Sequence, residues 1–153
     1  MSPTGEAPSA GFTLLELMVV LVLAGLLMAL VPPLLEKGTD AARLRADTRR
    51  LVDMLQLARS HAIARSAETD FVIDLETRRY GIPPERLDGS IDDGVDVEMK
   101  MAEAERLAPR RAAVRFFPDG SASGAQIRLA NPAGAATVQV DWLTGRVTAR
   151  TGG

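Results

Sequence analysis

The residue with the most unusual chemical setting in this sequence is Glu16. It is the only charged residue in the apolar run 12–35. A carboxylate deep in a bilayer costs about 2.5–3.5 kcal/mol on insertion scales, so an acid in such a run usually has a partner or a function. The run contains no Lys, Arg or His to pair with it. A cut between Gly11 and Phe12 would create an α-amino group roughly one helical turn before Glu16, on the same chain or on a packed neighbour.

The apolar run itself is long enough to cross a membrane. As a helix rising ~1.5 Å per residue, it would reach roughly 36 Å, against a hydrocarbon core of ~30 Å. A secretory signal peptide is disfavoured, because residues 1–11 contain no Lys or Arg and no Ala-x-Ala site follows the run. An ordinary membrane anchor, in which Glu16 is incidental, is the other alternative. The sequence therefore predicts a transmembrane helix over residues 12–35.

The residues around this acid resemble a known processing site. Gly11, followed by Phe-Thr-Leu-Leu-Glu, is similar to the cleavage site of type IV pilins and of the pseudopilins of type II secretion. The resemblance implies that a membrane peptidase, the prepilin peptidase, cuts after Gly11 and methylates the new N-terminal residue, Phe12. It also implies that Glu16 pairs with the N-terminus of an adjacent subunit during assembly and so sets its register.

Two further features of the N-terminal region bear on this resemblance. Pro33 falls where family members commonly carry a proline that interrupts the helix, and Pro32 precedes it, so we expect a helix kink there. The leader departs from the family pattern, since it is normally basic and here has Glu6 as its only charge. That departure weakens the orientation argument based on positive charge on the cytoplasmic side.

The bulk composition limits what the rest of the chain can be. The sequence has 153 residues, a formal net charge of -2 and no cysteine. Roughly 115–120 residues remain beyond the leader and the apolar run, which suits one small domain. The lack of cysteine excludes a disulfide scaffold, thiol catalysis and cysteine-ligated metal.

A second helical segment, with apolar residues on one face only, is predicted over residues 36–66. It contains no proline, and charged residues fill most of its other faces. The apolar positions recur at intervals of three and four residues, which predicts an amphipathic helix whose stripe covers a sheet. These positions are Leu44, Leu51, Leu55, Ala58 and Ala62.

The remaining residues, 67–153, are predicted to form a β-rich head. We expect strands at 69–75, 80–82, 95–101, 114–117, 126–129, 137–142 and 146–149, turns at 76–79, 87–90 and 118–124, and a charged loop at 102–111. The chain then divides into a cleaved leader at 1–11, a membrane and assembly half of the helix at 12–35, an amphipathic half at 36–66, and the head.

The chain beyond the apolar run offers only weak candidates for chemistry. His61 is the only histidine and has no cysteine near it. The acids at 92, 93 and 96 lack the spacing of a calcium loop. The glycine-rich stretch 120–124 has Ala122 where a nucleophile elbow needs serine. We therefore expect no enzyme activity, no metal and no cofactor, and we expect Trp142, beside a hairpin turn, to pack on the core.

The head also supports a narrower resemblance. Residues 115–124, Arg-Phe-Phe-Pro-Asp-Gly-Ser-Ala-Ser-Gly, and residues 140–147, Val-Asp-Trp-Leu-Thr-Gly-Arg-Val, are similar to the H-type minor pseudopilins of type II secretion, the GspH family. The implied fold is α+β and pilin-like, with a long N-terminal helix packed on an antiparallel sheet. Minor type IV pilins of the FimT kind, in pilus assembly or DNA uptake, are the close alternative. Arg146 and Arg150 are too few to indicate nucleic-acid binding.

The resemblance to the GspH family implies a structural role in protein export across the outer membrane. The subunit would sit in the inner membrane as a prepilin with its head in the periplasm, and would then join a short filament, the pseudopilus, in a minor complex at or near the tip. Its implied partners are other minor and major pseudopilins, the prepilin peptidase and the inner-membrane assembly platform. A membrane-tethered binding module is the remaining alternative; it would keep its anchor uncleaved and tolerate Glu16→Ala.

Overall fold

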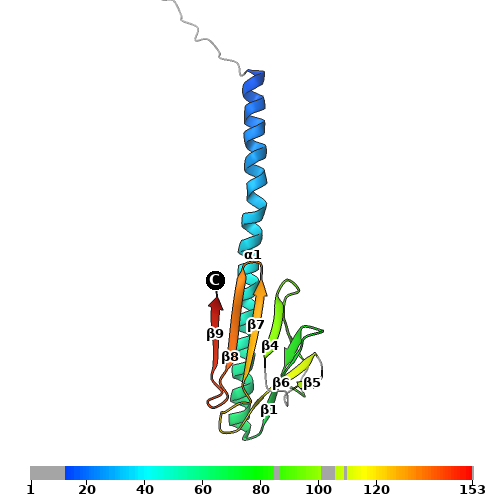
Figure 1. Ribbon diagram of the computed structural model, residues 1–153, viewed down its shortest axis with the longest axis vertical. Helices are drawn as coiled ribbons and strands as arrows, with labels where there is room; N and C mark the ends of the chain where they lie inside the picture. Colours follow the sequence, from blue (N-terminus) through cyan, green and yellow to red (C-terminus); the bar gives the residue numbers. More distant parts are fainter. Residues whose placement is uncertain (1–12, 85–86, 101–105, 109, 153) are drawn as a thin grey trace, which may run out of the picture. The chain divides into compact units, whose positions relative to one another are not determined.

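The computed structural model of the protein consists of one long helix followed by short strands (Figure 1). It describes residues 13–84, 87–100, 106–108 and 110–152, with the side chains of 29–37 and 106–108 outside that description. The elements are α1 (Leu14–Arg65), β1 (Thr69–Asp74), β2 (Arg79–Gly81), β3 (Gly89–Ser90), β4 (Asp96–Lys100), β5 (Arg106–Ala108), β6 (Arg111–Phe116), β7 (Ala125–Asn131), β8 (Gly134–Val140) and β9 (Val147–Gly152). The chain divides into two compact units, Met1–Glu36 and Lys37–Gly153.

The strands of the second unit form two antiparallel sheets. The first sheet has the order β3-β2-β1-β6-β5, and the second has the order β4-β7-β8-β9. Every neighbouring pair is antiparallel. The predicted α+β class, a long N-terminal helix packed on antiparallel β-structure, is therefore confirmed, and the β-structure consists of two sheets.

The chain changes sheets three times, because β4 belongs to the second sheet and β5 to the first, and the last change lies between β6 and β7. The sequence predicts a strand, a tight turn and a strand here, yet the chain after the turn pairs with β6 only briefly, through a bridge between Phe116 and Ala122. The amide of Ser123 donates to the carbonyl of Arg115 at 2.8 Å. Gly124 then adopts a φ of 80°, which favours glycine, and β7 begins in the other sheet.

The apolar stripe of the amphipathic helix forms the centre of the core. Each of the five predicted stripe positions is at most 4% exposed, which confirms the stripe: Leu44, Leu51, Leu55, Ala58 and Ala62. Side chains from both sheets join the same cluster, including Phe71 and Tyr80 of the first sheet, whose ring centroids are 5.7 Å apart. Helix burial against both sheets is therefore what holds the second unit together.

Three local predictions differ from the structure. The turn expected at 87–90 includes strand β3, and the loop expected at 102–111 includes strand β5 and the start of β6. Trp142 was expected on the core but is 67% exposed. Strand β8 ends at Val140, and Trp142 lies in the following turn, where the amides of Leu143 and Thr144 donate to the Asp141 carboxylate. Trp142 lies beyond the end of β8, so the sheet does not bury its side chain.

A buried carboxylate links the helix to the loop before β4. Asp47 is only 3% exposed, and its Oδ2 accepts a hydrogen bond from the amide of Asp92 at 2.9 Å. Its Oδ1 lies 3.6 Å from the guanidinium of Arg50. The loop is thus anchored to α1 by a side chain that has lost most of its water.

We expect Asp47→Ala to lower the free energy of unfolding by about 1–3 kcal/mol, because it removes the acceptor of the partly buried hydrogen bond from the Asp92 amide. Chemical denaturation of the full chain in detergent measures this loss. Asp53→Ala is the matched control, since it removes an exposed carboxylate from the same helix and should change stability by less than about 0.5 kcal/mol. Equal effects of the two variants would contradict the anchoring role of Asp47.

Three turn aspartates should make stability depend on pH in the acidic range. Backbone donation from Thr77 lowers the pKa of Asp74, the Ser121 hydroxyl lowers the pKa of Asp119, and backbone donation from Thr144 lowers the pKa of Asp141. Because each folded pKa lies below the unfolded value of about 3.9, the stabilisation is fully present above that value and is lost as pH falls through the folded pKa.

Replacing Asp74, Asp119 and Asp141 together by Asn should therefore flatten the acidic part of the stability profile. Asn can still accept the turn hydrogen bonds but does not titrate. Melting temperatures measured between about pH 6 and about pH 2 should fall less for this variant than for the native chain. An unchanged fall would show that these turns do not contribute to the acid dependence.

Candidate functional site

The start of α1 places Glu16 in the first turn of the helix. Thr13 precedes the helix, and the amide of Glu16 donates to the Thr13 carbonyl at 3.1 Å and to the Thr13 hydroxyl at 3.3 Å. Thr13 is therefore the N-cap residue and Glu16 the N3 residue, and the Thr13 hydroxyl makes one of the two hydrogen bonds of a capping box. This capping of the Glu16 amide was not predicted from the sequence, although the spacing Thr-x-x-Glu was its signal.

The carboxylate of Glu16 is available to a partner from elsewhere. The residue is exposed, and within the part of the chain that the structure describes no cation lies within 4.0 Å of it. Gly11 and Phe12, the predicted cleavage and methylation positions, lie outside the described residues. The pairing of Glu16 with an N-terminal amine thus stays a prediction.

The first part of α1 is apolar on all of its faces. Its large side chains between residues 14 and 28 are 50% to 78% exposed. A helix that is apolar all round is normally covered by lipid or by other helices, so this surface indicates an environment other than water. Among the described residues, no helix is both long enough and apolar enough to cross a membrane.

The two prolines lie within α1. Helix α1 runs through Pro32 and Pro33 from Leu14 to Arg65. The side chains at these positions lie outside the described residues, and the predicted kink stays a prediction.

Of the residues weighed for metal or catalysis, Asp92 makes contacts that belong to the fold. Asp92 accepts the amide of Gly94 at 2.9 Å and lies 3.9 Å from Arg43, so its carboxylate shapes the loop before β4. No metal-binding group of three or more His, Cys, Asp or Glu side chains occurs among the described residues. His61 has a buried Nδ1 without a hydrogen-bond partner, and Ala122 is 5% exposed in the glycine-rich turn.

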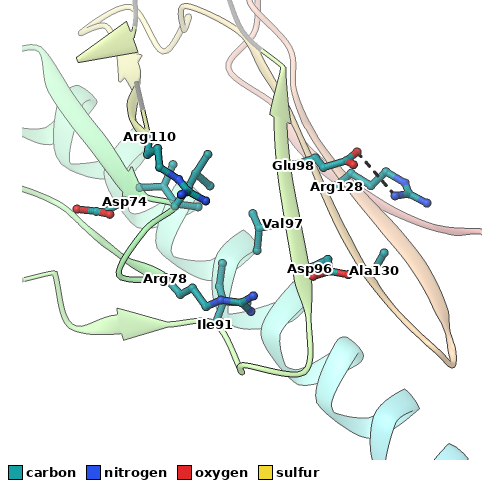
Figure 2. Close-up of a pocket in the computed structure, with 11 residues that line it drawn as sticks. Asp74, Arg78, Ile91, Asp96, Val97, Glu98, Arg110, Arg128 and Ala130 are labelled. Atoms are coloured by element: carbon teal, nitrogen blue, oxygen red, sulfur yellow. Dashed lines mark ion pairs between the residues drawn. The ribbon is translucent and has the colours of Figure 1, made fainter. Parts of the chain in front are cut away.

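A polar cleft of about 450 Å³ lies between the two sheets (Figure 2). Asp74, Arg78 and Arg110 line it from the side of the first sheet, and Asp96 and Glu98 of β4 line the other side. Three acidic and three basic residues line it, so neither charge dominates.

Several charged side chains of the cleft already form hydrogen bonds or ion pairs with neighbouring strands and loops. The Nη1 of Arg78 donates to the carbonyls of Asp92, Asp93 and Val95 at 3.0, 3.2 and 2.7 Å, which holds the loop before β4 in place. Glu98 pairs with Arg128 of β7 at 3.8 Å. Among the described residues that line the cleft, none is Ser, Thr, Cys or His.

Two family models match the chain. The model described as type II transport protein GspH matches residues 47–145, and the prokaryotic N-terminal methylation motif matches residues 7–32. The second match contains Gly11, Phe12 and Glu16. The two matches together cover the start of α1 and most of the head.

Relatives and solved structures agree with these matches. The type II secretion system protein H of Xanthomonas campestris pathovar campestris is 31% identical over 146 residues, which cover 95% of this chain and 86% of that protein. The minor pseudopilin EpsH of Vibrio cholerae is similar in structure with a TM-score of 0.56 at 14% identity, over 71% of this chain and 97% of that one. The type IV minor pilin FimU of Pseudomonas aeruginosa gives 0.54 at 15%, over 74% and 92%.

The structural likeness and the sequence likeness carry different information. At 14–15% identity the resemblance to both EpsH and FimU shows the fold alone, and this fold occurs in a pseudopilin and in a pilin. The GspH model matches 99 residues in sequence, and the relative in Xanthomonas campestris aligns with nearly the whole chain. The chain belongs to the GspH family of type II transport proteins.

Proposed function

We propose that the protein is a minor pseudopilin, a structural subunit of the pseudopilus of a type II secretion system. The observation that carries this proposal is the combination of a GspH-family head with a helix that is apolar all round except for Glu16 in its first turn. The role is mechanical, and the family is one of structural subunits. Its direct partners are other pseudopilins.

In this proposal the chain is anchored in the inner membrane by residues 12–35, with the head in the periplasm. The prepilin peptidase cuts after Gly11 and methylates Phe12. The subunit then leaves the bilayer sideways into the filament with the help of the inner-membrane assembly platform, and takes a place at or near the tip, where it contributes to starting assembly.

The physical basis of this transfer is that the apolar helix exchanges one apolar environment for another. Lipid tails are as apolar as leucine side chains, so packing among neighbouring helices costs the surface at 14–28 little. An unpaired carboxylate is expensive in either setting. Pairing Glu16 with the amine that cleavage creates on a neighbour removes that cost only at the correct axial position, which selects the register.

The fold likeness to FimU raises the alternative of a minor type IV pilin. That likeness shows the fold alone, and the family match favours the secretion system. Arg150 is exposed on β9 and Arg146 in the turn before it, but two arginines do not form the clustered basic footprint that phosphate binding needs.

Processing provides the first test. We expect the chain purified from membranes with coexpressed prepilin peptidase to begin at methylated Phe12, as measured by intact mass and N-terminal sequencing. Gly11→Ala should leave the leader in place, because the peptidase needs the glycine in this family. A chain that keeps its leader in the presence of the peptidase, or one cut after the apolar run, would contradict the pseudopilin proposal and favour a tethered binding module.

The two roles of Glu16 can be separated by substitution. Glu16→Gln keeps a side chain that suits a capping box but removes the charge, whereas Thr13→Ala removes the N-cap hydroxyl and keeps the charge. We expect Glu16→Gln to lower incorporation into sheared pseudopili roughly tenfold or more, since it loses the charge pair, which is worth several kcal/mol in an apolar setting. Thr13→Ala should retain most incorporation, with helix stability lowered by about 0.5–2 kcal/mol.

Western blots of membrane and filament fractions measure both outcomes at matched expression. Glu16→Asp, which retains the charge, is a further control and should be incorporated better than Glu16→Gln. Normal incorporation of Glu16→Gln together with loss for Thr13→Ala would mean that Glu16 acts through the helix start and not through a charge pair.

A further inference from the structure

The last strand of the second sheet has a free outer edge. Strand β9 ends the order β4-β7-β8-β9, and in the described parts of the chain no strand pairs with its outer side (Figure 1). A strand in this position carries a row of backbone N–H and C=O groups with which a further extended chain can pair. The strand contains no proline and no acid, and its one charged residue is Arg150. Its composition therefore permits the addition of a strand.

One face of β9 stands open beside α1. On β8 the side chains that join the core and face α1 are Ala136, Val138 and Val140. Directly paired residues of two strands point to the same face, so their partners on β9 also face the helix. These partners are nevertheless half-buried or exposed: Val147, Ala149 and Thr151. The inward face of β9 is therefore accessible along the flank of the helix.

Two recesses lie between this face and α1. The lining of the first, of about 280 Å³, includes Arg45 and Arg49 of α1 and Ala149 of β9. The lining of the second, of about 460 Å³, includes Arg59 of α1 and Arg146 immediately before β9. Because both recesses lie between the same helix and the same strand, they are here together called the α1–β9 groove.

The α1–β9 groove carries positive charge that the fold does not neutralise. None of the described residues that line either recess is acidic. In the described ranges, no carboxylate lies within 4.0 Å of the guanidinium of Arg45, Arg49 or Arg59. Arg146 interacts electrostatically with Asp141, whose carboxylate accepts three hydrogen bonds within its own turn. An acidic ligand would thus meet three arginines that have no carboxylate partner.

Arg59 is held in position at one end of the groove. It is half-buried and donates through Nε to the carbonyl of Gly120 at 3.0 Å. The arginine fits there because Gly145 has no side chain; a Cβ on Gly145 would lie 2.9 Å from the Arg59 Nε and closer still to the Gly120 carbonyl. Neither terminal nitrogen of the Arg59 guanidinium donates to a residue that the structure describes. The fold therefore presents a fixed pair of donors, which is the geometry that a carboxylate accepts.

The spacing of the arginines matches an extended chain. Arg45 and Arg49 lie about one turn apart on α1, roughly 6 Å along its axis. Side chains on one face of a strand recur at every second residue, roughly 6.6–6.8 Å apart. An extended chain paired with β9 would therefore place alternate side chains opposite successive arginines. From Arg45 to Arg59 the helix rises roughly 21 Å, which a strand covers in six or seven residues, about the length of β9.

Three observations identify the kind of occupant. The free edge of β9 offers backbone hydrogen bonds that another polypeptide backbone can match, whereas a nucleic acid or a lipid headgroup cannot. None of the described residues that line the recesses is aromatic, although surfaces that bind single-stranded nucleic acid stack bases on aromatic side chains. The acidic edge strand of this chain, β4, is a poor occupant, since Glu98 already pairs with Arg128 and Lys100 adds a positive charge. The groove therefore suits an acidic polypeptide other than a second copy of this chain.

We propose that the α1–β9 groove binds an extended acidic segment of a different protein. The segment adds as a strand to the outer edge of β9 and directs carboxylates at alternate positions toward Arg45, Arg49 and Arg59. In this mode of recognition, main-chain hydrogen bonds supply affinity and the side chains supply specificity. The contact deepens the minor pseudopilin role by naming a head surface for a partner, and it rests on that role for its cellular setting. It does not require cleavage after Gly11.

A defined peptide tests the groove on the purified full-length chain in zwitterionic detergent. The probe is a fluorescent peptide of about ten residues in which glutamate alternates with valine, so that its carboxylates share one face of a strand. Fluorescence anisotropy at low salt, where charges are least screened, measures its affinity. We expect binding roughly tenfold tighter than that of a peptide of the same composition with pairs of glutamates between pairs of valines, which divides the carboxylates between both faces. Methylation of alternate backbone nitrogens, which removes the donors that face β9, should weaken binding by a similar factor.

Substitution of the arginines tests where the peptide binds. Arg45→Glu combined with Arg49→Glu should weaken binding of the alternating peptide roughly tenfold or more, since two attractive pairs become repulsive. Arg65→Glu is the matched control, because Arg65 is exposed at the C-terminal end of the same helix and lines neither recess. It should change the affinity by less than about twofold, because solvent and salt screen a distant exposed charge. Thermal melting of each variant checks that the head remains folded.

Three results with the purified chain would overturn the proposal: no binding of the alternating peptide, an equal loss for the control variant, or tighter arginine-dependent binding of a single-stranded oligonucleotide or of anionic lipid vesicles.

Photo-cross-linking extends the test to cells that contain the complete secretion system. A photoreactive residue in place of Ala149 should form an adduct with an acidic segment of a different protein, identified by mass spectrometry. The same residue in place of Thr148, on the other face of β9, is the control and should form much less adduct. An adduct with a second copy of this chain, or no adduct, would overturn the proposal. Normal processing at Gly11 alongside any of these results would leave the pseudopilin function in place.

Discussion

The structure depends on a change in the surface of one helix. Over residues 14–28, α1 is apolar on every face, whereas from Leu44 to Ala62 its apolar residues form one stripe that is buried against the sheets. The same backbone therefore satisfies two environments, since an all-round apolar helix needs lipid or other helices and a one-sided helix needs a core. The head residues can vary widely as long as they cover that stripe.

Burial of the stripe explains why the head has two sheets. A single helix stripe presents two flanks, and side chains of the first sheet, such as Phe71, and of the second, such as Ile127, reach the same cluster from different strands. The last change of sheet follows β6, where Gly124 has a positive φ, and the cleft of Figure 2 lies between the sheets. Arg78 and Asp47 hold the loop before β4 by hydrogen bonds to its backbone, which closes one side of that cleft.

Structural features that are encoded by neighbouring residues could be predicted from the sequence, whereas features that depend on distant residues could not. The stripe from Leu44 to Ala62 was predictable, because helical periodicity is written in consecutive residues. Strand pairing was not, since β6 pairs with β1 across more than thirty residues and short strands such as β3 have no pattern of their own. Trp142 was misplaced because its type suggested burial, while its exposure follows from where β8 ends.

At the candidate site, the sequence predicted the residue but not all of its contacts. Glu16 stood out because a single acid in an apolar run is unusual, and this is a property of composition that requires no structure. Its hydrogen bond to Thr13 became evident only with the helix start in place. The two roles are compatible: the cap fixes the first turn through the backbone amide of Glu16, and the carboxylate is left for another chain.

The low identity to EpsH and FimU suggests where specificity within this fold resides. Their fold is retained at 14–15% identity, so the burial pattern of the helix and sheets tolerates extensive substitution. Turns are under no such constraint from the core, and the turn 141–146 between β8 and β9 shows the consequence. Gly145 and Asp141 fix its backbone, while Trp142 and Leu143 contribute little to the core and are exposed to whatever lies beside the head. A rigid turn with exposed apolar side chains can thus change its partner by substitution without unfolding the domain that carries it.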